Sequence, residues 1–99
     1  MANIQTKLDL LKEVVTDEGS LNLVLDKLLD TILEEQRLRL NRYQGDLKNL
    51  EVRYGMSSAE FYQKFEQGKL GDAMDFFEWA GLFELQRDLL EKIHRLETA

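Results

Sequence analysis

The chain of 99 residues lacks cysteine and proline and has a single histidine, His94. Without cysteine, neither a disulfide framework nor a thiolate metal site can form. A single histidine excludes a multi-histidine metal site and leaves no orienting pattern for a nucleophile, so we assign His94 a structural or solvent role. The longest apolar run is three residues, far short of the roughly 20 that span a bilayer. The absence of proline and the abundance of Leu, Glu, Lys, Arg and Gln favour helices.

Other absences narrow the function classes. The start, MANIQTKLDLLKEVV, has no basic segment followed by an apolar core, so we expect no secretory signal and a cytoplasmic protein. The only glycine-lysine pair, in GKLGD, lacks the spacing of a phosphate-binding loop, and we expect no cofactor. A net charge of −6 argues against nucleic acid or an anionic membrane as the main partner and favours a basic protein surface.

The charge is unevenly distributed along the chain. Residues 36–53 contain five basic and two acidic side chains, whereas residues 57–91 contain eight acidic and three basic ones. Two interpretations remain open. The segments neutralise each other, within one chain or across a dimer, or the acidic segment is a binding face.

Periodicity predicts one all-α domain over residues 1–99, with helices over 4–15, 20–54, 58–67 and 72–96. In the first helix, apolar residues recur at spacings of four, three and four from Ile4 to Val15. Gly19 is available for a left-handed turn after this helix, and Ser20 is the expected N-cap of the second.

The second predicted helix is the longest, and its later half carries a coiled-coil repeat. The repeat alternates spacings of three and four and consists of Leu33, Gln36, Leu40, Tyr43, Leu47, Leu50 and Tyr54. We call these seven residues the seam. Such a narrow apolar stripe requires another helix, from the same chain or from a second copy, and we predict a homodimer or higher homo-oligomer through it. Gly45 lies opposite the seam and is a candidate site for a break in the helix.

Gly55 is placed to end the long helix, and MSSAEF has the pattern of a helix start. Ser57 and Glu60 form a predicted capping box, and Met56 and Phe61 a hydrophobic staple. The short third helix ends at Gly68. Asp72 is the expected N-cap of the last helix, which is broadly apolar on one side. Together the elements predict a helical hairpin or bundle.

The stretch from Tyr54 to Glu84, YGMSSAEFYQKFEQGKLGDAMDFFEWAGLFE, contains most of the aromatic residues. It resembles the core of small prokaryotic antitoxin-type proteins, the TumA-like partners of TumE-type toxins, which read YGMSSEEFY, GELGDD and DFFEWAALYE. This chain departs from that pattern at Ala59, Lys69, Ala73 and Phe83, and these changes make the block less acidic.

The resemblance implies a non-catalytic protein that neutralises a co-encoded toxin by direct contact. An acidic, aromatic-rich surface suits the basic groove of a nuclease-like toxin. The candidate contacts are Asp72, Asp75, Phe76, Glu78 and Trp79. Helical spacing also allows most of the aromatic residues in this stretch to build the core of the chain itself.

Two alternatives remain open. One is a structural coiled-coil protein without a toxin partner. The other is a metal-dependent helical nucleotide hydrolase, in which Asp72, Asp75 and Glu78 share a helix face. Its second carboxylate pair would come from Asp26 and Asp30 or from Glu34 and Glu35.

Overall fold

The structure is a computed structural model that describes residues 3–15 and 17–99. Within these ranges the chain forms four helices: α1 (Ile4–Val14), α2 (Glu18–Tyr54), α3 (Ser58–Glu66) and α4 (Met74–Glu97). The same residues contain no strand, so the all-α prediction is confirmed. In neither range does a helix have the length and apolar character needed to cross a membrane. The backbone divides into two compact units, Met1–Ile32 and Leu33–Ala99.

The start of α2 differs from the sequence prediction. Asp17, rather than Ser20, precedes the helix, and its Oδ2 accepts hydrogen bonds from Ser20 N at 3.1 Å and Ser20 Oγ at 2.8 Å. Gly19 therefore lies inside the first turn of α2 and not in a left-handed turn. Both Asp and Ser are good N-caps, and here the earlier residue starts the helix. These hydrogen bonds, chiefly from Ser20, hold the pKa of Asp17 below its ordinary value.

The other end of α2 follows the prediction. The helix runs without interruption through Gly45 and ends at Tyr54. Gly55 follows with a φ of 66°, a left-handed conformation that glycine adopts without steric cost, and its N–H donates to Glu51 O.

The predicted start of α3 is also confirmed, with one change. Ser57 Oγ accepts a hydrogen bond from Glu60 N at 3.1 Å, as an N-cap does. Glu60 pairs with Lys64 on the next turn, at 3.3 Å. The change is that the Glu60 carboxylate has Lys64 as its partner and does not complete the capping box. A carboxylate from α2, Glu51 Oε2, accepts a hydrogen bond from the backbone N–H of Ser58 at 2.8 Å. Met56 packs against the core cluster that contains Phe61, as the predicted staple requires.

Gly68 ends α3, as predicted. It has a φ of 69°, and the amides of Gly68 and Lys69 donate to the carbonyls of Phe65 and Lys64. This pair of bonds is the Schellman arrangement, which satisfies the last carbonyls of a helix. The start of α4 corrects the prediction, because Ala73 occupies the N-cap position and provides no side-chain hydrogen bond.

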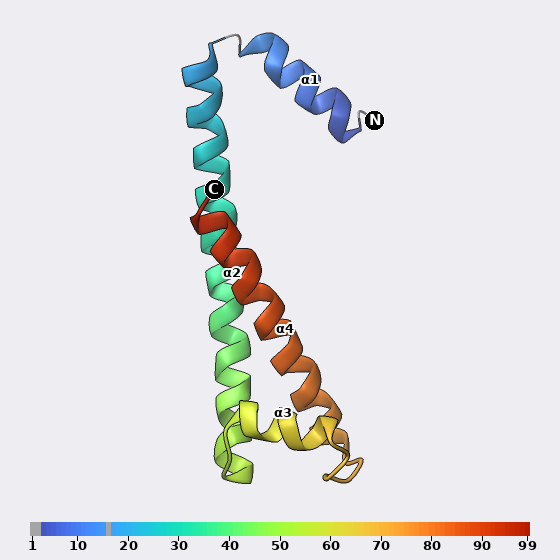
Figure 1. Cartoon of the computed structure of the whole chain (residues 1–99). Coiled ribbons are helices and arrows are strands. Elements are labelled where there is room, and N and C mark those ends of the chain that lie inside the picture. Colours follow the sequence, from blue (N-terminus) through green and yellow to red (C-terminus); the bar gives the residue numbers. More distant parts are fainter. Residues whose placement is uncertain (1–2, 16) are drawn as a thin grey trace. The chain divides into compact units, whose positions relative to one another are not determined.

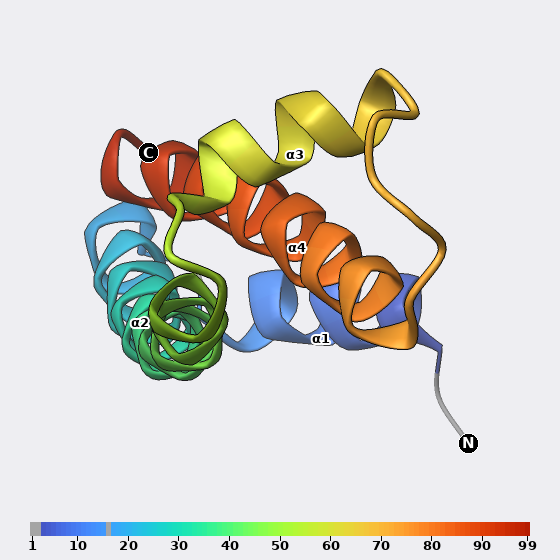
Figure 2. The ribbon, with the colours of Figure 1, turned by 90° about the horizontal axis from the view of Figure 1, so that it is seen from below.

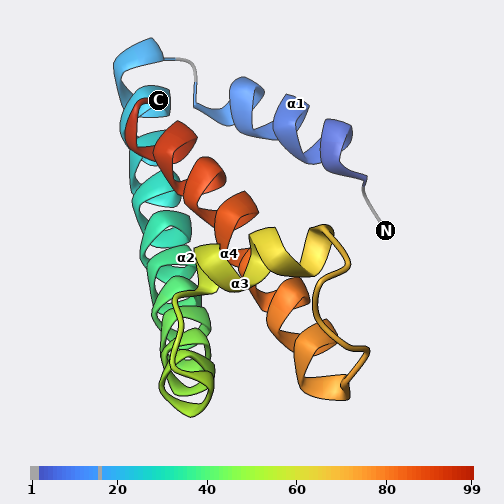
Figure 3. The same ribbon diagram turned by 60° about the horizontal axis from the view of Figure 1, so that its bottom comes forward.

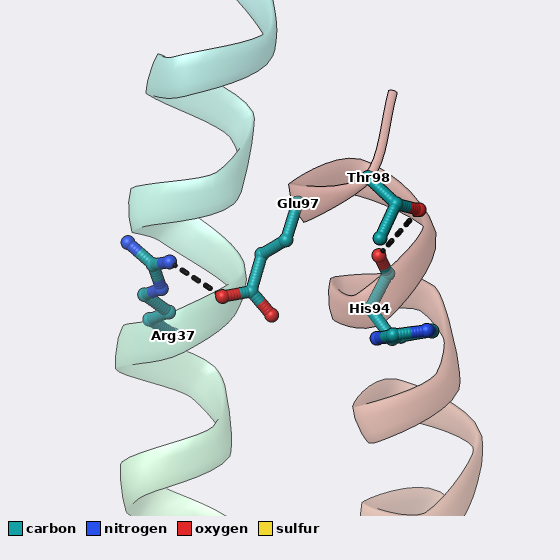
Figure 4. Close-up of polar contacts among 4 residues, drawn as sticks. All are labelled: Arg37, His94, Glu97 and Thr98. Carbon is teal, nitrogen blue, oxygen red and sulfur yellow. Dashed lines mark hydrogen bonds and ion pairs between the residues drawn. The ribbon is translucent and has the colours of Figure 1, made fainter.

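In the unit Leu33–Ala99, α4 runs antiparallel to the later half of α2 (Figure 1). An ion pair marks each end of this pairing. Arg53 near the end of α2 meets Asp75 near the start of α4 at 2.9 Å, and Arg37 meets Glu97 at 3.0 Å. Figure 4 shows the second pair beside the end of α4, where the carbonyl of His94 accepts a hydrogen bond from Thr98. The side chain of His94 is exposed.

Helix α3 lies across the first half of α4, and both helices lie on one side of the later half of α2 (Figures 2 and 3). Their junction forms the core, which consists of Leu47, Leu50, Phe61, Trp79 and Ala80. Tyr54, Tyr62, Phe65 and Phe76 pack around it. The aromatic residues of the sequence motif therefore serve mainly to join three helices.

The seam packs within the single chain. Leu47 and Leu50 are 3% and 7% exposed in the core, and the other five seam residues are half-buried. Gln36 and Tyr43 line a small cleft together with Leu89 of α4. Part of the seam therefore faces α4 of the same chain, with Leu47 and Leu50 in the core and Gln36 and Tyr43 at the cleft beside Leu89.

Candidate protein-binding site

The predicted contact residues lie in the first two turns of α4, apart from Asp72, which lies just before the helix, and the structure separates them by depth. Asp72 and Glu78 are exposed, Asp75 and Phe76 are half-buried, and Trp79 is fully buried. This separation follows from the period of the helix, because only one side of α4 can face α2 and α3.

Trp79 is the centre of the core. Its ring stacks on Phe61 of α3 with centroids 3.9 Å apart and an interplanar angle of 4°. Tyr54 of α2 stacks on it from another direction, with centroids 5.5 Å apart. The indole Nε1 donates a hydrogen bond to Ser58 Oγ at 2.9 Å, so its one polar atom is satisfied inside the core. A partner would reach Trp79 only if the hairpin of α3 and α4 opened.

Asp75 connects α4 to the end of α2. Its Oδ2 accepts hydrogen bonds from Tyr54 Oη at 2.6 Å and from Arg53 Nη1 at 2.9 Å. These bonds, the one from Tyr54 first, hold the pKa of Asp75 below its ordinary value. The same hydrogen bond raises the pKa of Tyr54. Asp75 therefore positions α4 through one of its two carboxylate oxygens, Oδ2.

A second tyrosine and carboxylate join α3 to α4. Tyr62 Oη donates to Glu84 Oε1 at 2.6 Å, and Arg87 lies over the Tyr62 ring at 5.6 Å from its centroid. Glu84, followed by Glu66, raises the pKa of Tyr62 to about 12. With the Tyr54–Asp75 bond, this contact makes the junction of the three helices a rigid frame.

Two apolar side chains that the sequence analysis did not single out are exposed on this frame. Met74 is 81% exposed and Phe77 is 53% exposed. Phe77 is held edge-on against Phe65 of α3, with centroids 5.7 Å apart and an interplanar angle of 89°. Their spacing of three residues places them on one side of α4, displaced from the side of Phe76 and Trp79.

Asp72 and Glu78 lie beside these apolar side chains and are exposed. Glu78 also lines a shallow cleft of about 270 Å³ between α4 and α2, together with Asp46, Asn49 and Arg53. We call Asp72, Met74, Phe77 and Glu78 the α4 start surface. It combines two large apolar side chains and one carboxylate in the first two turns of α4 with a second carboxylate, Asp72, just before the helix.

The described residues, 3–15 and 17–99, include no group of three or more His, Asp or Glu side chains arranged to hold a metal ion. Of the carboxylates considered for a metal site, Asp75 is bound to Tyr54 and Arg53.

The basic segment 36–53 and the acidic segment 57–91 form an ion pair within the chain. Arg53, from the basic segment, pairs with Asp75, from the acidic one. This pair is between α2 and α4 of the same chain. The carboxylates of the α4 start surface remain at the exterior.

Comparison of the chain with protein-family models, with curated proteins and with solved structures finds no match.

Proposed function

We propose that this chain is a non-catalytic protein-binding module that neutralises a toxin encoded beside it by direct contact. The observation that carries the proposal is the α4 start surface, where Met74 and Phe77 are exposed between carboxylates. The resemblance of Tyr54–Glu84 to antitoxin-type proteins supplies the class of partner.

The exposed side chains have the character of binding anchors. Large apolar side chains that fill pockets of a partner provide most of the binding energy at many interfaces. Phe77 is already held against Phe65, so less side-chain freedom is lost when it binds than for an unrestrained side chain.

The carboxylates give the surface its preference among partners. Asp72 and Glu78 would lie opposite basic groups of a toxin, and such complementarity speeds association and disfavours acidic competitors. Glu78 shares its cleft with Asp46, which adds a second carboxylate on the α2 side. A nuclease-like toxin, whose substrate groove must be basic to bind nucleic acid, fits this surface.

Asp75, Phe76 and Trp79 have a supporting role in this proposal. They hold the first turns of α4 against α2 and α3, and so fix the direction in which Met74 and Phe77 point. Substitution of these three residues would reduce binding through the fold.

The test is co-expression of the chain with the product of the adjacent open reading frame, scoring growth rescue and complex formation. We expect the adjacent product to arrest growth alone, and the chain to restore growth and co-purify with it. If the chain neither restores growth nor forms a complex with the adjacent product, the proposal is contradicted and the structural coiled-coil alternative is favoured. Rescue without a complex would contradict direct contact.

A matched pair of variants locates the surface. Met74→Ala with Phe77→Ala removes the exposed apolar side chains of α4, and we expect loss of rescue. Leu38→Ala with Val52→Ala removes two side chains of α2 that are 61% and 72% exposed, and we expect full rescue. The α2 substitutions should change stability by only about 0.5 kcal/mol. Phe77→Ala also removes the contact with Phe65, worth about 0.5–1.5 kcal/mol, so the melting temperature of each variant is measured beside rescue.

A further inference from the structure

The unit Met1–Ile32 has no core of its own. None of its described residues, 3–15 and 17–32, is buried, although many of them are apolar. Leu25, Leu28 and Val24 are 36%, 54% and 42% exposed in the presence of α1, which belongs to the same unit. Helices of this length gain most of their stability from the packing of an apolar face, so an exposed face of this size requires a cover.

The apolar residues of this part of α2 form a symmetric stripe. Leu21, Leu25, Leu28 and Ile32 recur at spacings of four, three and four, which read the same in both directions. The centre of the stripe lies between residues 26 and 27. A stripe with this symmetry can pair with a second copy of itself running in the opposite direction.

In such a pairing every layer is apolar. Leu21 would lie opposite Ile32 of the second copy, and Leu25 opposite Leu28 of the second copy. The two-fold axis generates the same two pairs with the copies exchanged, so the contact has four layers. Val24 and Leu29 lie beside the stripe and would widen the contact. This arrangement is that of an antiparallel coiled coil over about three turns.

The charges around the stripe permit a second copy. The four positions that flank it are all uncharged: Asn22, Val24, Leu29 and Thr31. The hydroxyl of Thr31 is already bonded to the carbonyl of Lys27 at 3.0 Å. At 100° per residue, Asp26, Lys27 and Asp30 point about 130° or more from the centre of the stripe. Two copies therefore bring no like charges together within the four apolar layers. The next layer outward would place Glu18 opposite Glu35 of the second copy, so the contact is limited to residues 21–32.

We propose that the chain forms an antiparallel homodimer through Leu21, Leu25, Leu28 and Ile32. This interface is distinct from the predicted seam, of which Leu47 and Leu50 are buried in the core that α2 shares with α4. The proposal is independent of the toxin-binding function, because the α4 start surface lies in the other unit.

The first test is sedimentation equilibrium of the full chain over a range of concentrations. The wild type should be a dimer at micromolar concentration. Leu28→Glu places a charge in two layers of the dimer, and we expect its dissociation constant to rise by at least about 100-fold. Leu23→Glu is the matched control. Leu23 is 55% exposed on the same helix but points away from the stripe, and its dissociation constant should stay within about threefold of the wild type.

The second test fixes the direction of pairing. The natural chain has no cysteine, so Leu25→Cys and Leu28→Cys each introduce a unique thiol. When the two variants are mixed and oxidised, with one of them isotopically labelled, antiparallel pairing yields mainly the mixed disulfide between labelled and unlabelled chains. This measurement also keeps the proposal testable if Leu28→Glu unfolds the unit.

Three results would overturn the proposal. In the first, the wild type is a monomer at every concentration, and Leu28→Glu still lowers the melting temperature more than Leu23→Glu does. That result would mean that α1 of the same chain covers the stripe. In the second, the wild type is a monomer and Leu28→Glu abolishes its binding to the co-encoded partner, which would assign the stripe to that partner. The third is a dimer that Leu28→Glu does not weaken or in which each cysteine variant pairs with itself.

Discussion

The indole Nε1 of Trp79 donates a hydrogen bond of 2.9 Å to the hydroxyl of Ser58, and both residues are buried, at 0% and 5% exposure. The bond joins the first residue of α3 to the second turn of α4. Ser58 N–H in turn donates to Glu51 of α2. One serine therefore connects all three helices that meet at the core.

Ser58→Ala should lower the free energy of unfolding by about 1–3 kcal/mol, because the buried indole N–H loses its acceptor. Chemical denaturation measures this change. In a Trp79→Phe background the same substitution should cost under about 0.5 kcal/mol, because no donor is left without a partner. An equal cost in both backgrounds would mean that the bond adds nothing beyond packing.

Gly45 inside α2 and Gly55 just after its end should respond oppositely to alanine. Gly45→Ala should stabilise the protein by about 1 kcal/mol, because the position is helical and the added Cβ meets no atom within 4 Å. Gly55→Ala should destabilise it by about 1–2 kcal/mol, because a φ of 66° is unfavourable for alanine. The melting temperatures of the two variants give the comparison, and shifts in the same direction would contradict the assigned helix end.

Asp75 makes stability depend on acid pH. Because its pKa is lower in the folded state than in the unfolded one, its contribution is present above the unfolded pKa and is lost as pH falls through the folded one. Asp75→Asn should therefore be destabilising at about pH 7, and its stability should approach that of the wild type at about pH 2. Urea denaturation at the two pH values tests this expectation.

The same pair can be followed by carbon NMR of the carboxyl group. Tyr54→Phe should raise the pKa of Asp75 towards its ordinary value, because the hydrogen bond from Tyr54 is the largest cause of the shift. A pKa that does not respond to this substitution would assign the effect to Arg53.

Tyr62 should ionise near pH 12, which ultraviolet titration of the tyrosinate signal measures. Since the folded pKa is raised, the stabilising effect is present below the unfolded pKa of about 10 and is lost as pH rises towards 12. Glu84→Gln should bring the ionisation to lower pH, and Tyr62→Phe should remove the late step. An unchanged titration in Glu84→Gln would contradict the assigned hydrogen bond.

Local signals predicted the helix ends where one residue type had no competitor. Gly55 and Gly68 take left-handed conformations, and Ser57 caps α3, as the sequence indicated. The predicted N-caps of α2 and α4 were wrong, because several neighbouring residues could start each helix. Asp17 and Ser20 are both N-caps by type, and Asp72 was expected at a position that Ala73 occupies.

The composition of the site depended on contacts between distant parts of the chain. Phe76 and Phe77 are adjacent, and only the position of α3 decides which of them is half-buried and which is exposed. Asp75 looked free in the sequence because its partners, Arg53 and Tyr54, are 22 and 21 residues away. Met74 gave no local signal, because a methionine near a helix start is compatible with burial or exposure.

The most direct test of the proposed function is the affinity of the purified adjacent gene product for three forms of the chain, measured by titration calorimetry. Met74→Ala with Phe77→Ala should weaken binding by at least about 100-fold, because anchors of this kind contribute about 2 kcal/mol or more each. Leu38→Ala with Val52→Ala should stay within about threefold of the wild type. Equal affinity for all three forms would contradict the assigned surface, and no binding by the wild type would contradict the proposed function itself.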